Sequence, residues 1–475
     1  MDMILTKITH SMDPDKRDSY IYAITLMGLF TFLFLGVEYF FVNVLSHIVP
    51  GNQTVLAQNY VLGVSSAGFA LYALFEHFCK DRLKEGCFIF IALLSVLCMA
   101  FIYMGTTYTA VFFAGFVLFL LLGLTGSAVF YISMCRMKTE QYLARTVGIS
   151  YALGILLQFV NNNLIRSELA EMIVLSVFLL ILIALLLKWD YCKEDKVQTN
   201  FSLSDEEGND VNGKIVGILL ILLVLLMTCI FSTLDNAVTL VHSNGEMDIG
   251  QWPRILLAFS GLVAGFVFDL KNRKYMGIIM YCVMVLSTIC IAVLKFSGLF
   301  LVGLIIFYLS TGFFAVFFTC GFMEISRYMK VPELWAGMGR AVNNMTAAII
   351  AGPVLLLLSS DRDLATIVLI LVLFAAVSIV AVMYTFQKKI FLEELIAMMA
   401  EEINDEEKLR NFSELFSFTE RESEVFSRLV NTEDNNQEIA ESLFVSRRTL
   451  ERHISAIYEK TGVKSRIGLL NLYHK

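Results

Sequence analysis

The chain has little charge for its size. Asp, Glu, Lys and Arg make up 17% of its 475 residues, whereas 57% of the residues are apolar. A soluble surface with so few charged groups would aggregate, while contact with lipid suits this composition. The composition therefore excludes an ordinary soluble globular protein and indicates a multi-span membrane protein. The net charge of −7 says little about nucleic-acid binding, because local patches decide that contact.

The sequence also lacks the motifs of several enzyme classes. It has no Gly-rich phosphate loop, no zinc-spaced His pair and no G-x-S-x-G elbow on a suitable element, and its six His are dispersed. Nine Cys are scattered without a C-x-x-C pair, which favours reduced thiols used for packing. We therefore expect no enzymatic activity, no metal and no cofactor. The polar N-terminal segment, 1–19, gives no sign of a cleavable signal peptide.

Apolar runs long enough to cross a membrane occur twelve times. A helix needs about 20 apolar residues to span the hydrocarbon core. A polar segment, 190–213, separates six runs within 20–189 from six within 214–386, so we expect two six-helix halves joined by a loop. The expected spans are 20–45, 57–79, 86–104, 109–135, 146–165, 171–189, 214–240, 253–270, 275–295, 298–323, 335–359 and 363–386.

Lys and Arg are distributed unevenly between the loops. Alternate loops, including 190–213, carry most of the basic residues that lie near the spans. The loops between them carry only Arg166, Arg254, Lys295 and Arg362. The positive-inside rule therefore predicts an inner-membrane protein with the basic loops and both termini in the cytoplasm.

The loop after the eighth expected span combines Gly, Asp and basic residues. From Gly265 to Lys274 it reads GFVFDLKNRK, and the corresponding loop of the first half keeps Asp81 and Arg82 without the glycine pattern. This loop and the six-plus-six arrangement resemble the major facilitator superfamily over about 20–386. The resemblance implies two halves related by a pseudo-two-fold axis, with Asp269 paired to basic groups and a helix end. The alternative is that both loops only fix the topology.

Ionisable and amide groups inside lipid are costly unless they face protein or a wet cavity, so they indicate where a ligand binds. The third, sixth, ninth and twelfth expected spans carry no internal charge, as peripheral helices would. Polar groups on other spans predict an outward-opening cavity for an unidentified polar or cationic small molecule. For each residue, the alternative is a helix cap or a bond between helices. The candidate ligand-sensing residues are Glu38, Asn161, Asp235, Asn236 and Asn343.

Segment 387–416 is polar, and its apolar residues recur with a helical rhythm. Phe391, Leu395 and Met399 alternate with acidic residues, so we expect an acidic amphipathic linker helix. The acidity argues against close binding to anionic lipid or to DNA. The helix could pair with a second copy or lie under the membrane domain, and a solvated spacer is the alternative.

The last segment, 417–475, has the signals of short capped helices. Thr419 and Glu422 fit a capping box that starts one helix, and a second helix follows a polar loop at 431–436. Ser446 fits the N-cap of a third helix, in which Leu450, Ile454 and Ile457 recur on one face and predict a small core. The opposite face is basic at its first turn, where Arg suits the O6 and N7 atoms of guanine.

Four segments of this region resemble the LuxR-type helix-turn-helix family. Residues 418–425, 436–443, 446–453 and 457–466 follow its patterns L-T-x-R-E-x-E-V, N-K-E-I-A-x-x-L, S-x-x-T-V-x-x-H and I-Y-x-K-x-G-V-x-S-R. Glu451 departs from the pattern, where a basic residue is common. The resemblance implies a four-helix domain that binds double-stranded DNA and whose last helix, about 465–473, is able to support a homodimer. The candidate DNA-binding residues are Ser446, Arg447, Arg448, Thr449, Glu451, Arg452, His453, Lys460, Lys464 and Arg466.

These patterns predict an all-α chain with a polytopic twelve-helix membrane bundle and a C-terminal four-helix DNA-binding domain at 417–475. A DNA-binding domain that is fixed to a membrane domain can reach DNA only at the cytoplasmic face of the membrane. We therefore expect a ligand-sensing transcription regulator whose partners are DNA, the lipid bilayer, a small molecule and a second copy on DNA. The alternatives are a transporter with a regulatory DNA-binding tail and a regulator whose membrane part is only an anchor.

Overall fold

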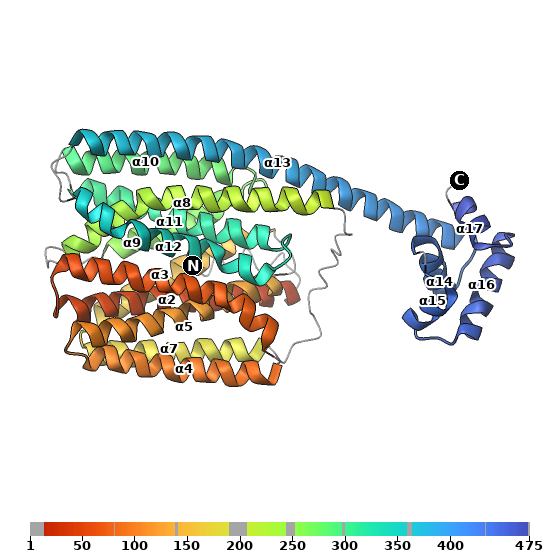
Figure 1. Cartoon of the computed structure of the whole chain (residues 1–475), viewed down its shortest axis with the longest axis horizontal. Coiled ribbons are helices and arrows are strands. Elements are labelled where there is room, and N and C mark those ends of the chain that lie inside the picture. Colours follow the sequence, from red (N-terminus) through yellow and green to blue (C-terminus); the bar gives the residue numbers. More distant parts are fainter. Residues whose placement is uncertain are drawn as a thin grey trace. The chain divides into compact units, whose positions relative to one another are not determined.

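The computed structural model describes residues 14–79, 81–137, 141–189, 207–243, 252–296, 300–358, 363–432 and 434–473. Within these ranges all regular secondary structure is α-helical, which confirms the expected fold class (Figure 1). The chain divides into two compact units, Met1–Lys388 and Lys389–Lys475. We call them the membrane domain and the C-terminal domain.

Within the described residues, twelve helices form the membrane domain and the linker that continues its last helix, as the apolar runs predicted. The first half holds α2 (Pro14–Ser46), α3 (Gly51–Phe78), α4 (Asp81–Met104), α5 (Tyr108–Arg136), α6 (Leu143–Leu164) and α7 (Glu168–Trp189). The second half holds α8 (Glu207–Ser243), α9 (Pro253–Phe268), α10 (Met276–Phe296), α11 (Phe300–Ser326), α12 (Pro332–Leu358) and α13 (Asp363–Leu415). Among the described residues, nine of these helices are long and apolar enough to cross a membrane, and α9 and α10 contribute shorter apolar helices.

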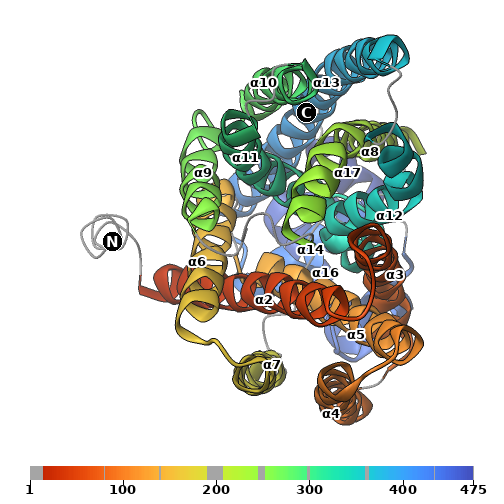
Figure 2. The ribbon, with the colours of Figure 1, turned by 90° about the vertical axis from the view of Figure 1, so that its left-hand side faces the viewer.

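The helices without internal charge lie at the periphery. Figure 2 shows α4 and α7 on the outer edge of one half, and α10 and α13 on the outer edge of the other. These are the third, sixth, ninth and twelfth helices of the bundle. The expected peripheral positions are therefore confirmed.

Small residues bring the two halves into close contact. Helix α3 packs against α12, and α6 packs against α9. A Cβ atom at Gly148 would lie 2.7 Å from the carbonyl oxygen of Gly261, and one at Gly265 would lie 2.7 Å from that of Ala144. Because no side chain fits at these points, the backbones of α6 and α9 approach more closely than larger residues would allow.

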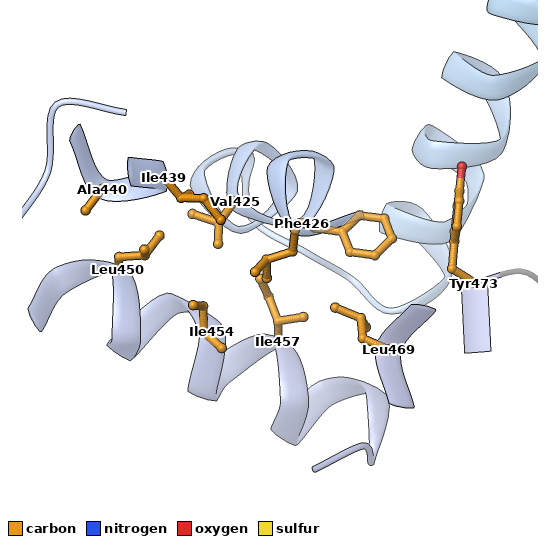
Figure 3. Close-up of a cluster of buried hydrophobic side chains, with 10 residues drawn as sticks. Val425, Phe426, Ile439, Ala440, Leu450, Ile454, Ile457, Leu469 and Tyr473 are labelled. Atoms are coloured by element: carbon orange, nitrogen blue, oxygen red, sulfur yellow. The ribbon is translucent and has the colours of Figure 1, made fainter. Parts of the chain in front are cut away.

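Within the described residues, the C-terminal domain contains four short helices, as the family resemblance implied: α14 (Glu420–Asn431), α15 (Asn436–Ser442), α16 (Arg447–Thr461) and α17 (Arg466–Tyr473). Leu450, Ile454 and Ile457 of α16 point into a common core, which confirms the face predicted for them (Figure 3). Phe426 of α14 and Leu469 of α17 are fully buried in the same core.

No break separates the twelfth span from the linker. Helix α13 runs for 53 residues from Asp363 to Leu415. At its end, the ring of Phe412 stacks on that of Phe426 at 4.8 Å with an interplanar angle of 8°, and meets Tyr473 edge-on at 5.5 Å. The end of the linker is thus part of the core of the C-terminal domain, which contradicts the alternative of a purely solvated spacer.

Candidate DNA-binding surface and membrane cavity

The first helix of the C-terminal domain begins at the expected capping box. The Thr419 hydroxyl accepts a hydrogen bond from the Glu422 amide at 3.3 Å, and the Glu422 carboxylate accepts one from the Thr419 amide at 2.7 Å. Lys460 Nζ donates to the same carboxylate at 2.6 Å and to the Ser417 carbonyl at 2.8 Å. Burial raises the pKa of Glu422, but the bonds from Lys460 and Thr419 outweigh burial and lower it below its ordinary value.

A second capping box starts α15, and the sequence analysis missed it. The side chain of Asn435 accepts from the amides of Gln437 and Glu438 at 2.9 and 3.1 Å, and the Glu438 carboxylate accepts from the Asn435 amide at 2.8 Å. The spacing of Asn and Glu three positions apart carries this signal in the sequence. The box fixes the helix that precedes the turn into α16.

A short turn leads from α15 into α16, the third short helix of the C-terminal domain. Phe444 has a φ of 55°, which reverses the chain, and its side chain is 96% exposed. Ser446 then caps α16 as expected, because its hydroxyl accepts from the Thr449 amide at 3.2 Å. Helix α16 therefore starts with exposed side chains on its first turn.

The exposed face of α16 carries two cations with no partner among the described residues. Arg448 and Arg452 are exposed and make no hydrogen bond or ion pair within the described parts of the chain. Arg447 is also exposed, but its Nε lies 3.0 Å from the Glu451 carboxylate. A group of DNA that binds Arg447 would therefore compete with Glu451. Arg448 and Arg452 could bind DNA without first breaking a bond to a described residue.

Two of the candidate DNA-binding residues, Lys460 and Arg466, make bonds within the C-terminal domain. Arg466 donates to three backbone carbonyls: from Nε to Leu429 at 2.9 Å, from one terminal nitrogen to Asp434 at 2.5 Å and from the other to Thr432. It thereby closes the loop between α14 and α15. Lys460 holds the Glu422 carboxylate described above. Of the remaining candidates, Lys464 and Thr449 are exposed and His453 is half-buried.

A cavity of about 160 Å³ lies in the centre of the membrane domain. Helices of both halves line it: α2, α3 and α6 from the first, and α8, α9, α11 and α12 from the second. Its charged and amide lining includes Glu38, Gln58, Asp235, Arg254, Arg340 and Asn343. The polar cavity expected from the sequence is present, and three of its five candidate residues, Glu38, Asp235 and Asn343, face it.

Asn161 and Asn236 do not line the cavity. Asn161 donates from Nδ2 to the Glu171 carboxylate at 3.2 Å, which joins α6 to α7. Asn236 accepts at Oδ1 from Asn59 Nδ2 at 2.8 Å and is 1% exposed. These two amides make bonds between helices, which is the alternative that the sequence left open for each polar residue.

Two arginines of the cavity were not expected. Arg254 follows Pro253 at the start of α9 and was assigned only to a loop, whereas Arg340 lies inside the expected span 335–359. The rule that singled out Glu38 applies equally to Arg340. Its guanidinium carbon lies over the rings of Phe34 and Phe318, 5.4 Å from each centroid. The formal charge of the cavity lining is therefore balanced rather than acidic.

A second polar cluster joins the two halves near Lys388, at the start of the linker. The Asp269 carboxylate accepts from the amides of Ala144 and Arg145 at 3.2 and 2.8 Å, so it caps the first turn of α6. Arg273 lies 3.5 Å from Asp269 and donates to Glu324 at 3.1 Å, and Lys388 of α13 donates to Glu324 at 2.6 Å. The predicted pairing of Asp269 with basic groups and a helix end is confirmed. The side chains of Asp81 and Arg82 lie outside the described residues.

Comparison with known proteins agrees with both parts of this description. Residues 416–472 match the family described as bacterial regulatory proteins, luxR family. None of the curated proteins matches the chain significantly. Similar solved structures include an auto-inhibited peptide transporter of the POT family, with a TM-score of 0.53 and 11% identity over 78% of this chain and 97% of that chain.

Two further transporters have a similar structure. The POT family transporter PepTSo has a TM-score of 0.50 and 12% identity over 79% of this chain and 98% of that chain. The human organic anion transporter MFSD10 has a TM-score of 0.50 and 13% identity over 79% of this chain and 100% of that chain. At these identities the likeness shows the fold alone. The C-terminal domain is thus a LuxR-type helix-turn-helix domain, and it is fused to a membrane domain of the major-facilitator-like fold.

Proposed function

We propose that this LuxR-type DNA-binding domain and its major-facilitator-like membrane domain together form a membrane-embedded bacterial transcription regulator that senses a small molecule. The observation that carries the proposal is the continuity of α13, whose segment Leu371–Ala397 is a candidate membrane span and whose Phe412 belongs to the core around Phe426. A rearrangement of the membrane domain can therefore act on the DNA-binding domain through one unbroken helix. Such a contiguous element is what coupling between distant sites needs.

A ligand in the cavity is suited to bias the arrangement of the two halves. A ligand shifts a conformational equilibrium only if it prefers one arrangement over another. Because both halves line the cavity, relative movement of the halves changes the positions of its binding groups. The cluster of Asp269, Arg273, Glu324 and Lys388 then provides a route from α6 of the first half to the root of the linker on α13.

The proposed orientation places both termini in the cytoplasm, where DNA is accessible. The distribution of Lys and Arg between the loops supports it. A reporter fused after Lys475, or inserted into the loop at 190–213, should show cytoplasmic activity. Periplasmic activity at either position would contradict the orientation and, with it, DNA binding by the native protein.

Genomic occupancy of the full-length protein tests the proposal directly. Cross-linking followed by immunoprecipitation should recover discrete DNA sites for the wild type and for Arg410→Ala, a control in an exposed pair with Glu414. Arg448→Ala combined with Arg452→Ala should lose those sites while the protein remains in the membrane. Equal recovery of the same sites by the double variant would rule out α16 as the reader.

A transporter with a regulatory tail is the second candidate function. The three solved structures compared above are transporters, and one cavity lined by both halves suits that activity. Uptake by proteoliposomes distinguishes the two functions. Accumulation of a ligand against its gradient would favour transport, whereas binding without accumulation would favour a sensor.

A further inference from the structure

The guanidinium group of Arg340 has no hydrogen-bond or ion-pair partner among the described residues. Its Nε atom is buried without an acceptor among them. A guanidinium carries five N–H donors and remains charged. Because a buried, unpaired charge is strongly unfavourable, this group indicates a site that an external anion completes.

The surroundings of Arg340 select the shape of that anion. The rings of Phe34 and Phe318 lie on the guanidinium at 5.4 Å, and all three side chains line the cavity. The rings occupy part of the surface of the guanidinium, which leaves its N–H groups to be reached from the cavity. A planar carboxylate matches such a fork with two parallel hydrogen bonds.

Acidic side chains of the same cavity can bind a positively charged group of the ligand. Glu38 Oε1 accepts from Gln58 Nε2 at 2.6 Å, and Asp235 makes no hydrogen bond or ion pair with any described residue. Arg254 and Arg340 both attract Glu38 electrostatically. With two arginines and two carboxylates, the formal charge of the lining is balanced. A purely anionic ligand would leave the carboxylates unmatched, and a purely cationic one would leave the arginines unmatched.

The volume limits the ligand to a small molecule. The cavity of about 160 Å³ is close to the roughly 150 Å³ of an engineered cavity that binds benzene. Phe231 and Phe314 stack at 4.4 Å beside it and supply an apolar wall. A molecule with two charged ends and one apolar group of this size has the dimensions of a single amino acid.

We propose that the cavity binds a small zwitterion of the α-amino-acid type, with its carboxylate on Arg340 and its ammonium group on Glu38. The inference rests on the proposed role of the cavity as the ligand site. It adds the chemical class, and it assigns Arg340 as the residue that recognises the anionic end. The same assignment holds for a sensor and for a transporter.

Thermal unfolding of the full-length protein in lipid nanodiscs tests this inference. The probes are the twenty standard L-amino acids, followed by the decarboxylated amine and the N-acetyl derivative of the one that stabilises most. At least one amino acid should raise the melting temperature, because a ligand of the folded state stabilises it, and neither derivative should reproduce the shift. Arg340→Gln should remove the shift, while Arg166→Gln, a control at an exposed position, should keep it.

The folding of the variants is checked independently of binding. Because Arg340→Gln removes an unpaired charge, its melting temperature without ligand should equal or exceed that of the wild type. Glu38→Gln should reduce the preference for the free amino acid over its N-acetyl derivative. Absence of a shift with all twenty amino acids, or an undiminished shift in Arg340→Gln, would overturn the inference. Binding that leaves genomic occupancy unchanged would instead support the ligand class and refute the sensor.

Discussion

The helix caps of the C-terminal domain and the bonds between helices of the membrane domain differ in how far apart their bonded residues lie in the sequence. In the C-terminal domain, the bonds of Thr419 with Glu422 and of Ser446 with Thr449 join residues three positions apart. In the membrane domain, Asn59 and Asn236 are 177 positions apart, and Ser65 and Asn344 are 279 apart. Local bonds can be predicted from spacing alone, whereas long-range bonds depend on helix packing that no spacing records.

This difference explains which predictions succeeded. Twelve apolar runs predicted twelve helices because the bilayer sets their length, and helix caps predicted the start of α16 at Ser446. The polar residues of the spans were visible, but their directions were not. Asn161 and Asp235 both lie in spans, yet Asn161 bonds to α7 while Asp235 faces the cavity. Only the arrangement of the helices separates the two cases, because it places Glu171 of α7 within reach of Asn161 and packs α8 against α12.

The largest expected effect concerns Phe412, an aromatic side chain that enters the C-terminal core from outside the matched family region. Phe412→Ala should destabilise the fragment Lys389–Lys475 by about 2–3 kcal/mol, less than the 3–5 kcal/mol of a fully buried Phe, because Phe412 is half-buried. Urea unfolding of the fragment measures this. Leu415→Ala, at a side chain that is 75% exposed, is the control and should change the stability little. Equal stability of both variants would show that the core does not depend on the linker.

A second prediction tests whether local geometry also predicts function. Arg448→Ala should weaken binding to a specific DNA site by about 1–3 kcal/mol, the range for a good bidentate contact to a base. Lys464→Ala should instead weaken all DNA about equally and flatten the salt dependence. Binding titrations at several salt concentrations separate the two effects. Arg447→Ala should have a smaller effect than Arg448→Ala, since Arg447 is paired with Glu451.

The third prediction compares two polar residues that the sequence could not distinguish. Asp235→Asn should reduce the response of DNA binding to ligand, by at most the 1–3 kcal/mol typical of coupling between sites. Asn161→Ala should leave the ligand dose-response unchanged, because its side chain bonds to Glu171 away from the cavity. A dose-response assay of occupancy in cells, with expression matched, measures both. A larger effect of Asn161→Ala than of Asp235→Asn would contradict the assignment of the cavity.

The smallest effect is expected for the pH dependence of the C-terminal domain. Bonds from Lys460 and Thr419 lower the folded-state pKa of Glu422, so its ionised form stabilises the fold above the ordinary pKa of 4.5. This stabilisation, about 1 kcal/mol for a partly exposed charged bond, is lost as the pH falls through the lowered pKa. Glu422→Gln should therefore be less stable than the wild type at pH 7, and the difference should shrink below pH 4.5. A constant difference between pH 3 and pH 7 would show that the capping geometry, and not the charge, matters.

The contact of Phe412 with Phe426 also determines where proteolysis can separate an intact C-terminal domain from the membrane domain. The match to the regulatory family begins at residue 416, four positions after a ring that belongs to the core. Proteolysis before Leu409 would release a soluble fragment with that core complete. Cleavage between Phe412 and Phe418 would release one that lacks the ring stacked on Phe426. The cleavage site therefore decides whether the released fragment is an intact DNA-binding protein or a substrate for degradation.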